Sequence, residues 1–309
     1  MFLLFSEFAK LANNSNSNIM QQRIFFSALA ALVLSFSQVQ GQEEGEFHLD
    51  DAYALSANGI IHLNSEDADV RITGSDRSDV HVKIDRIEYV NGIRSGSRNF
   101  TVNVEEVNGD LVIKERRSGS VRFSIGSFRT EYSITIEMPR SGGLKIEGED
   151  DDYVIKNVDG SISMRVEDGD IELLDTKSES IEVRIEDGDL RLDGGLGELM
   201  IENEDGDLDV RNGAFTRVDI ETEDANVSIE TSLADDGTYE ITSDDARIDF
   251  VVLSGGGRFY VSKDDGRVSS GSAFKIEEER DHRVTLSLAG GKADVDVRVN
   301  DGRVRFSKR

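Results

Sequence analysis

Apolar and polar residues alternate along most of the chain, and the alternation is organised in a repeating unit. It is clearest in Gly160–Val210, where the phrase Glu-Asp-Gly-Asp occurs three times, with its glycines at Gly169, Gly188 and Gly206. These glycines are 19 and then 18 residues apart. Alternation is the period of a half-buried strand, and Asp-Gly is a turn signal because glycine tolerates a positive φ. The pattern predicts one supersecondary unit, copied and stacked along the chain.

The apolar positions of this unit persist where the turn phrase decays. The turn recurs in altered form at six places: Asp67-Ala68, Asp150-Asp151, Asp224-Ala225, Asp245-Ala246, Asp265-Gly266 and Asp301-Gly302. Seven residues before each turn centre the chain has an apolar residue: Ile61, Leu144, Ile162, Ile181, Leu199, Val218, Tyr239, Phe259 and Val295. Three further columns, five before the turn and two and four after it, are also apolar, with Ser270 as the single break. These columns predict continuous files of buried side chains.

Two architectures have a period near 18–20 residues: a β-solenoid and a meandering antiparallel sheet or sandwich. Identical residues that recur in register favour the solenoid, since each coil then buries its strands against its neighbours. We therefore predict an all-β chain with a single stack of coils. Gly266 and Gly302 are 36 residues apart, which predicts one more coil between them. Phe274 and Ile276 would form its first strand, 284–288 its second, and 277–283 a loop.

The chain before the repeats divides into three segments. Residues 1–19 are rich in Asn and Ser and precede a second methionine, Met20, which we interpret as the native start. Residues 20–41 have a basic residue, Arg23, then the 13-residue apolar run Ile24–Phe36 and small residues near Gly41. This is the pattern of a cleaved secretory signal; a buried helix or an anchor is the alternative, although the run is short for a membrane span. Residues 42–58 are polar and acidic, and we expect them to be flexible.

Residues 59–309 form the predicted solenoid domain. Its first coil is Gly59–Asp85, and 86–129 departs from the repeat as an irregular insertion of longer strands with Gly, Ser and Arg turns. The strand Tyr132–Met138 ends at the only proline, Pro139, which suits a strand end because proline has no amide donor. The arginine-containing excursion Ile93–Arg129 is where we expect a partner surface, since loops on a rigid scaffold commonly carry contacts.

Composition narrows the function classes. The chain of 309 residues has 62 acidic and 35 basic residues, a net charge of −27, and no Cys or Trp. The charges fall on the alternate, outward strand positions, which indicates a solvated face rather than disorder. So strong a negative charge argues against nucleic acid and anionic membrane surfaces as partners. The absence of cysteine excludes disulfides and thiol catalysis.

The order of these segments resembles a known family. It is an early coil, irregular strands, then Ile134-Thr-Ile-Glu-Met-Pro-Arg-Ser-Gly-Gly-Leu-Lys-Ile146, and then repeats of the form Ile181-Glu-Val-Arg-Ile-Glu-Asp-Gly-Asp-Leu-Arg-Leu192. This arrangement is similar to the bacterial adhesin-like β-strand-repeat family DUF4097, over roughly Gly59 to Phe306. The resemblance implies a fold but no catalytic residues. The family usually has Ser or Thr before the turn glycine, whereas this chain has Glu-Asp.

The acidic turns are the first candidate for chemistry. A solenoid would stack two files of aspartates, Asp168 with Asp187 and Asp205, and Asp170 with Asp189 and Asp207. Like charges about 4.8 Å apart repel, so a bound Ca²⁺, which takes six to eight oxygens, would relieve them. The alternative is that the carboxylates splay into water and are screened by salt and by neighbouring arginines. The calcium-binding nonapeptide of β-rolls is absent from the sequence.

An enzyme is the second candidate. Parallel β-helix enzymes act on polysaccharides with Asp clusters in a groove, but carboxylates are so common here that their presence has little weight. The four histidines are scattered, at His48, His62, His81 and His282. The sequence has no nucleophile elbow, phosphate loop, Rossmann fingerprint or zinc spacing.

We therefore predict a non-enzymatic, exported protein, periplasmic or at the cell surface, with no resident cofactor and no transmembrane helix after signal cleavage. It would act as an adhesin-like binding or structural surface for an envelope or surface protein or polysaccharide. A polysaccharide-active β-helix enzyme and a Ca²⁺-dependent surface-layer-type binding protein are the alternatives. A function argued from fold is associational.

Overall fold

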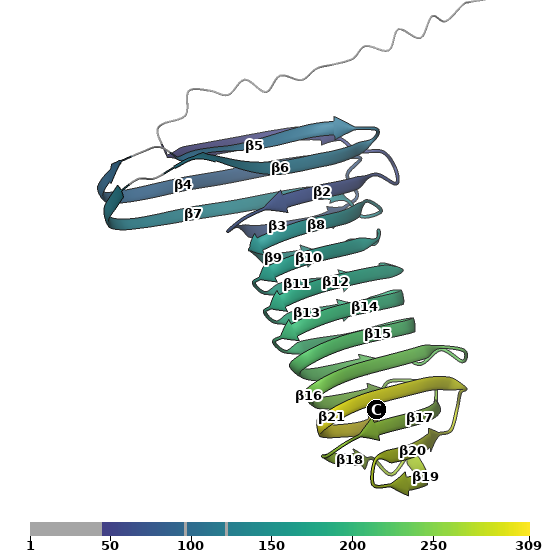
Figure 1. Ribbon diagram of the computed structural model, residues 1–309. Helices are drawn as coiled ribbons and strands as arrows, with labels where there is room; N and C mark the ends of the chain where they lie inside the picture. Colours follow the sequence, from purple (N-terminus) through teal and green to yellow (C-terminus); the bar gives the residue numbers. More distant parts are fainter. Residues whose placement is uncertain (1–44, 96–97, 121–122) are drawn as a thin grey trace, which may run out of the picture. The chain divides into compact units, whose positions relative to one another are not determined.

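The computed structural model describes residues 45–95, 98–120 and 123–309, and over those residues every regular element is a β-strand (Figure 1). The predicted extension 1–19, the predicted signal 20–41 and residues 42–44 lie outside the described residues. Part of the segment expected to be flexible is ordered in β1 (Glu46–Ala54), which pairs antiparallel with β4 (Asp79–Ser95). Its alternating Phe47 and Leu49 explain this, since they contact the core.

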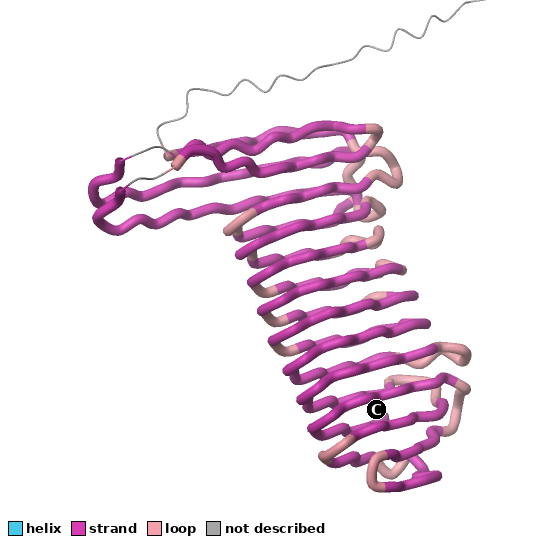
Figure 2. Tube along the Cα trace, in the orientation of Figure 1, coloured by secondary structure: helices cyan, strands magenta, loops and turns pink. Residues whose placement is uncertain are grey.

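Successive coils lie one above another, and corresponding strands of neighbouring coils pair in parallel (Figure 2). One face contains β8 (Gly143–Asp150), β10 (Ile162–Asp168), β12 (Ser180–Asp187) and β14 (Leu196–Asp205). The other contains β9 (Asp152–Lys156), β11 (Ile171–Thr176) and β13 (Leu190–Gly194). The register places Leu144, Ile162, Ile181 and Leu199 opposite one another. The parallel pairing confirms the β-solenoid, because a meander of hairpins would pair its strands antiparallel.

Lower in the stack the corner of the coil changes. β15 (Leu208–Thr231), β16 (Thr238–Val252) and β21 (Ala293–Lys308) each run through the corner as one bent strand. Ala225, Ala246 and Gly302 are opposite one another where the upper coils have a turn glycine. Two of these corners have Asp-Ala in place of Asp-Gly, and the third keeps Asp301-Gly302, so the strand is continuous there with either residue.

The first coil in the sequence is not the first in the stack. β2 (Ile60–Ser65) pairs with β8 on one side and with β6 (Asp110–Gly119) on the other, both in parallel. β3 (Asp69–Ser75) likewise lies between β9 and β7 (Phe123–Pro139). β6, from the predicted insertion 86–129, and the strand predicted at Tyr132–Met138, which is part of β7, thus form a coil on the outer side of the first coil.

The C-terminal end is interleaved in the same way. β21 pairs in parallel with β16 and also with β17 (Gly257–Lys263) and β18 (Arg267–Ser270). The extra coil predicted between Gly266 and Gly302 is wrong. β19 (Phe274–Arg280) and β20 (Arg283–Leu288) form an antiparallel hairpin that pairs with β17. A two-residue alternation fits either pairing direction, so the pattern does not distinguish a further coil from a hairpin. The hairpin pairs with the edge of β17 opposite β21, and β19 is its outer strand.

The predicted columns form the core between the two faces. Near the C-terminal end they include a cluster of aromatic rings, in which Phe259 lies 5.1 Å from Phe306 and 5.2 Å from Phe274, centroid to centroid. Phe250 lies 5.9 Å from Phe306 and completes the cluster. Truncating a buried phenylalanine to alanine costs about 3–5 kcal/mol, so this cluster holds β21 against its two neighbours.

A pair of long strands extends beyond the coils. β4 and β7 pair antiparallel from His81↔Glu137 out to Ser95↔Phe123. Only the inner part of this ribbon has further neighbours, because β1 pairs with β4 up to Ile87 and β3 pairs with β7 from Ser133. β5 (Arg98–Val107) pairs antiparallel with β6 beside it. We call the projecting parts of these strands, the described residues of 86–102 and 115–131, the arm (Figure 1).

Candidate functional site

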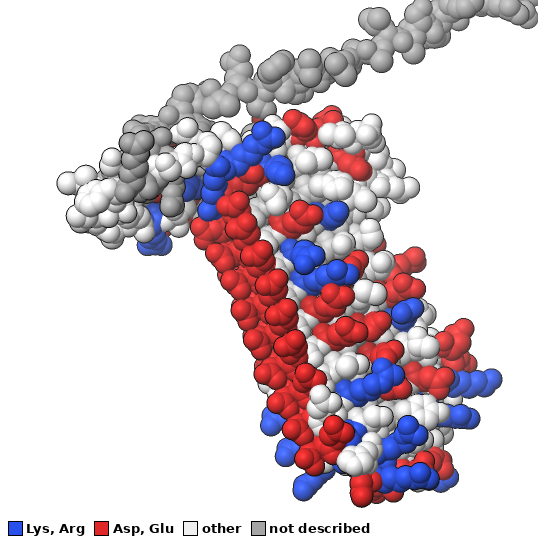
Figure 3. All heavy atoms as spheres, in the orientation of Figure 1, with Lys and Arg blue, Asp and Glu red and all other residues white. Residues whose placement is uncertain are grey.

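A file of aspartates follows the corner of the stack. The register places seven of them opposite one another, coil after coil: Asp150, Asp168, Asp187, Asp205, Asp224, Asp245 and Asp301. Figure 3 shows a red band down this corner of the molecule. We call these seven residues the acidic edge. The predicted stacking of Asp168, Asp187 and Asp205 is confirmed, and the edge extends well beyond the three perfect repeats.

The second predicted file is held by hydrogen bonds between coils. The Oδ1 of Asp170 accepts a hydrogen bond from the backbone N–H of Asp189 at 3.0 Å, and the Oδ1 of Asp189 accepts one from Asp207 at 2.8 Å. Asp207 continues the series to the backbone and side-chain N–H groups of Asn226. The carboxylates of this file therefore have a structural task, because they bind amides that the turn leaves unpaired. Sequence spacing alone predicts the stacking but not this bonding.

Glycine is required at the turns between these two files. The φ of Gly188 is +145°, and a Cβ there would lie 2.2 Å from the backbone oxygen of Gly169. Gly206 has a φ of +121° and would meet the oxygen of Gly188 at 2.1 Å. Only glycine allows both the backbone conformation and the close approach of the coil above. The close approach keeps consecutive aspartates in register.

The acidic edge has the electrostatics of closely spaced like charges. The pKa of Asp168 is raised above its usual value by partial loss of water, then by the charge of Asp187 and a hydrogen bond with Asp150. In the lower coils, arginines occupy the second file, with Arg247 and Arg267 each opposite Arg303. Uncompensated negative charge is therefore concentrated in the upper and middle coils. No three acidic or histidine side chains within the described parts of the chain are arranged to hold a metal ion.

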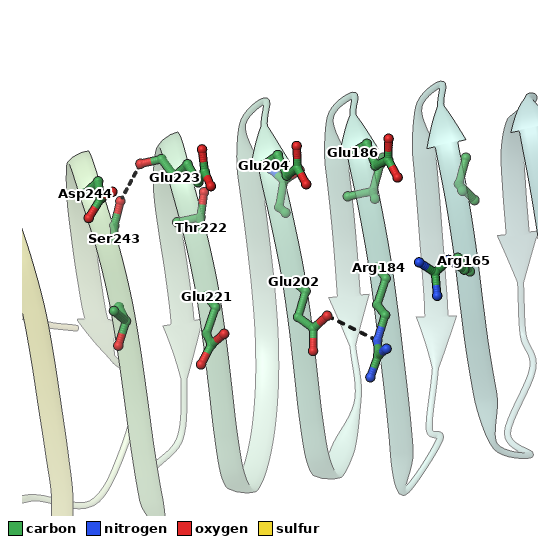
Figure 4. A pocket seen from close by; sticks show the side chains of 14 residues that line it. Arg165, Arg184, Glu186, Glu202, Glu204, Glu221, Thr222, Glu223, Ser243 and Asp244 are labelled. Carbon is green, nitrogen blue, oxygen red and sulfur yellow. Dashed lines mark hydrogen bonds and ion pairs between the residues drawn. The ribbon is translucent and has the colours of Figure 1, made fainter.

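A shallow groove of about 410 Å³ lies on the face formed by β10, β12, β14, β15 and β16 (Figure 4). Its charged lining comes from outward positions on successive coils: Arg165, Arg184, Glu186, Glu202, Glu204, Glu221, Glu223 and Asp244. Arg184 on β12 forms an ion pair with Glu202 on the next coil at 3.2 Å. It forms a second ion pair with Glu182, two residues away on its own strand, at 3.1 Å. The groove is a charged face with paired side chains, and its carboxylates stand in rows rather than around one point.

A buried carboxylate that sequence reasoning missed lies at the top of the acidic edge. Asp151 is 0 % exposed, and its Oδ1 accepts a hydrogen bond from the N–H of Ala68 at 2.6 Å. Its Oδ2 accepts hydrogen bonds from the hydroxyls of Ser65 and Tyr153, both at 3.1 Å. Burial raises the pKa of Asp151 although these donors favour the charged form. The one available signal was an Asp where other coils have the turn glycine.

A second missed cluster attaches the arm to the stack. Glu115 on β6 is buried, and burial raises its pKa even though Arg117 forms an ion pair with it. Arg117 also contacts Glu66 between β2 and β3, at 3.2 Å between Nε and Oε2. The guanidinium of Arg86 lies 4.6 Å from the centre of the Phe100 ring. Arg117 therefore ties β6 to the first coil, and the contact of Arg86 with Phe100 joins β4 to β5.

The four histidines are not brought together. Two histidines contact aspartates across the paired strands β1 and β4. His48 Nδ1 lies 2.9 Å from Asp85 Oδ1, and His81 Nε2 lies 2.7 Å from Asp50 Oδ1. His62 is next to Asp110 at 3.5 Å. His282 is near the backbone oxygen of Lys263 at the other end of the stack. Each is a partner in a local surface pair.

The arm has an exposed apolar face within the predicted partner surface Ile93–Arg129. Ile93 is 71 % exposed, Ile125 63 %, Phe123 53 % and Tyr89 48 %. Ile93 is directly opposite Ile125, and Phe123 is two residues from Ile125 on the same strand. Alternation in a strand therefore places these side chains on one face of the ribbon. Contiguous exposed apolar residues mark interaction sites on soluble proteins.

Comparisons with solved structures give remote likenesses. A candidate cell adhesion protein from Clostridium sporogenes has a TM-score of 0.29 at 14 % identity, over 85 % of this chain and 100 % of that one. A candidate adhesin from Bacteroides fragilis has a TM-score of 0.41 at 11 % identity, over 86 % and 100 %. A candidate lipid-binding protein from Parabacteroides distasonis has a TM-score of 0.35 at 11 % identity, over 85 % and 96 %. Likenesses at this level carry no information about a ligand.

No curated protein matches the chain. Within the described ranges there is no helix of the length and apolarity needed to cross a membrane. The family model called Toastrack DUF4097 matches residues 59–306, which is most of the chain and all of the coils described above. The parallel stack, its proline-glycine junction after β7 and the match together lead to one conclusion: the chain belongs to the Toastrack DUF4097 family.

Proposed function

We propose that this protein is an exported, non-enzymatic binding protein of the cell envelope or cell surface, in which the coil stack holds the arm out as the contact surface. The observation that carries the proposal is the exposed apolar face of Ile93, Ile125, Phe123 and Tyr89, on a scaffold that is densely charged on the face seen in Figure 3. Apolar side chains so exposed are costly in a free monomer unless a partner covers them.

The arrangement of the carboxylates supports a binding role over catalysis. General acid and base pairs need two carboxyl groups at one point with pKa values driven apart. Here the aspartates of the acidic edge are equivalent residues in a row, and those of the second file are engaged with backbone amides. The Asp151 carboxylate, whose environment differs, is fully buried and bonded to three donors.

The proposal is tested by affinity capture from the protein's own cell envelope, with the chain starting at Gln42 as bait. Shortening the ribbon by deleting 89–94 together with 124–129 removes paired residues from both strands while it leaves the β3 pairing of β7 intact. We expect captured envelope material with the native arm and none with the shortened ribbon. Equal capture by both baits would refute the arm as the contact surface.

A calcium-dependent surface protein is the second candidate, favoured by the raised pKa of Asp168 between Asp150 and Asp187. Ca²⁺ bound along the acidic edge would relieve the repulsion there, so millimolar Ca²⁺ should raise the melting temperature and EDTA should lower it. The residues to substitute are Asp168, Asp170, Asp187, Asp189, Asp205 and Asp207. An unchanged melting temperature at millimolar Ca²⁺ would remove this candidate.

A further inference from the structure

The arm differs in charge from the rest of the chain. Residues 89–104 and 116–130 contain no Asp or Glu, although the whole chain has a net charge of −27. The same two stretches contain six arginines: Arg94, Arg98, Arg116, Arg117, Arg122 and Arg129. Two of them have carboxylate partners at the inner end of the arm, since Arg117 pairs with Glu115 and Arg129 pairs with Glu131. The outer part of the arm is therefore cationic.

This cationic segment coincides with the apolar face. On the two strands, the pair of Ile93 and Ile125 is next to the pair of Arg94 and Ser124, and Tyr89 is directly opposite Arg129. A surface that combines exposed Ile, Phe and Tyr side chains with arginines has the composition of proteins that lie in the headgroup region of a bilayer. Apolar side chains enter the acyl boundary there, and guanidinium groups bind phosphates.

We propose that the outer arm docks on an anionic phospholipid surface, with Ile93, Ile125, Phe123 and Tyr89 as the inserted face. This inference rests on the proposed envelope location and names the partner of the same surface. A second copy of the chain fits less well. Two arms would bring like-charged arginines together, and an arm on the acidic edge would bury isoleucines against carboxylates.

The net negative charge of the protein does not oppose this docking at the arm itself. The nearest carboxylate on β4 is Glu88, five residues from Ile93, which in a strand is about 17 Å. Asp85, at the base of the arm, is eight residues away, or about 26 Å. The Debye length at physiological ionic strength is about 8 Å, so both charges are screened over two or more such lengths. The net charge of −27, which argued against anionic membranes as partners, is unevenly distributed along the chain, and residues 89–104 and 116–130 contain none of the acidic residues.

The test is co-sedimentation with vesicles of phosphatidylcholine alone and of phosphatidylcholine with 30 % phosphatidylglycerol, at low and high salt. The full chain and the chain starting at Gln42 are both used, since the apolar run Ile24–Phe36 could itself bind lipid. The test variant is Ile93→Ser with Ile125→Ser. The matched control is Ile276→Ser, an isoleucine that is 54 % exposed on β19 and remote from the arm.

We expect the chain starting at Gln42 to bind the anionic vesicles and not the neutral ones. The double serine variant should bind at least about tenfold more weakly, and Arg116→Ser about fivefold more weakly. Ile276→Ser should bind like the native chain. Circular dichroism of each variant establishes that the stack is folded.

Three results would overturn the inference. They are an absence of binding to anionic vesicles, equal losses for the arm and control variants, or self-association that the arm variants abolish in sedimentation velocity. If the protein does not bind the vesicles but capture of envelope material still depends on the arm, the partner is a protein or polysaccharide and the proposed function stands. If capture also fails, both are refuted.

Discussion

Replacing Asp151 tests how the acidic edge is anchored at its upper end. In Asp151→Ala the N–H of Ala68 loses its acceptor at 2.6 Å, while the hydroxyls of Ser65 and Tyr153 are 3.4 Å apart and can bond each other. An orphaned buried amide costs about 1–3 kcal/mol, and the space left by the carboxyl group adds to it. We expect a total loss of about 2–4 kcal/mol.

Asp151→Asn is the matched control. Its amide oxygen still accepts from Ala68, its amide nitrogen can donate to the two hydroxyl oxygens, and the burial cost of a charge is removed. We expect a loss of at most about 1 kcal/mol at neutral pH. Because burial raises the pKa of Asp151 in the folded chain, this group adds stability as the pH falls through that raised value. The Asn variant should lack that part of the pH dependence.

The assay is native-state hydrogen exchange, because stacked coils open locally rather than in one transition. The amides of Ala68 and of β3 should lose protection in Asp151→Ala, by roughly the 2–4 kcal/mol above in opening free energy. The amides of β16 and β21, many coils away, serve as the internal reference. The reasoning is refuted if the Ala and Asn variants lose equal protection, or if the Ala variant loses less than about 0.5 kcal/mol.

The remaining predictions concern a turn and a surface pair. In a urea titration, Gly188→Ala should lower the free energy of unfolding of its coil by at least about 2 kcal/mol, because φ is +145° and the new Cβ meets a backbone oxygen at 2.2 Å. Gly271→Ala is the control, since its Cβ has no neighbour nearer than 3.9 Å. It should change the free energy of unfolding by less than about 0.5 kcal/mol. The hydrogen bond to Asp85 raises the pKa of His48, against a smaller opposing effect of burial, so this pair stabilises the fold fully below the unfolded pKa of 6.5 and loses that contribution as the pH rises through the folded value. A proton NMR titration should show the His48 pKa falling in Asp85→Asn, and an unchanged value would contradict the assignment.

The internal order of the middle coils could be predicted from sequence because each position repeats its chemistry. Ile162, Ile181 and Leu199 occupy one column, and parallel pairing in register is the arrangement that buries all of them. The same argument predicted the aspartate files. Hydrogen bonding from the Asp170 carboxylate to the next coil could not be predicted, since an outward Asp looks the same whether it meets water or an amide.

The order of coils at the two ends could not be predicted, for a physical reason. The coils that contain Ile61 and Val295 have apolar residues at the same positions as every other coil, so the strands of either coil could pair in register with any neighbouring coil. Sequence order favours adjacent coils, but connections that skip one coil satisfy the same columns. The segment Ile93–Arg129 was predicted as a partner surface, but its apolar face was missed, because Ile93 and Ile125 have the pattern of buried strand residues and only the lack of a covering layer leaves them exposed.

The position of β21 has a consequence for how this protein comes into being. It lies between β16 and β17, so Ala293–Lys308 fills a gap between two strands that precede it in the sequence rather than extending the stack outward. In a chain that emerges in N-to-C order, β16 and β17 have two unpaired backbone edges until β21 is free to pair with both. A chain that lacks β21 would leave these two backbone edges unpaired and open to other strands, so β21 is the strand that closes the stack at this point.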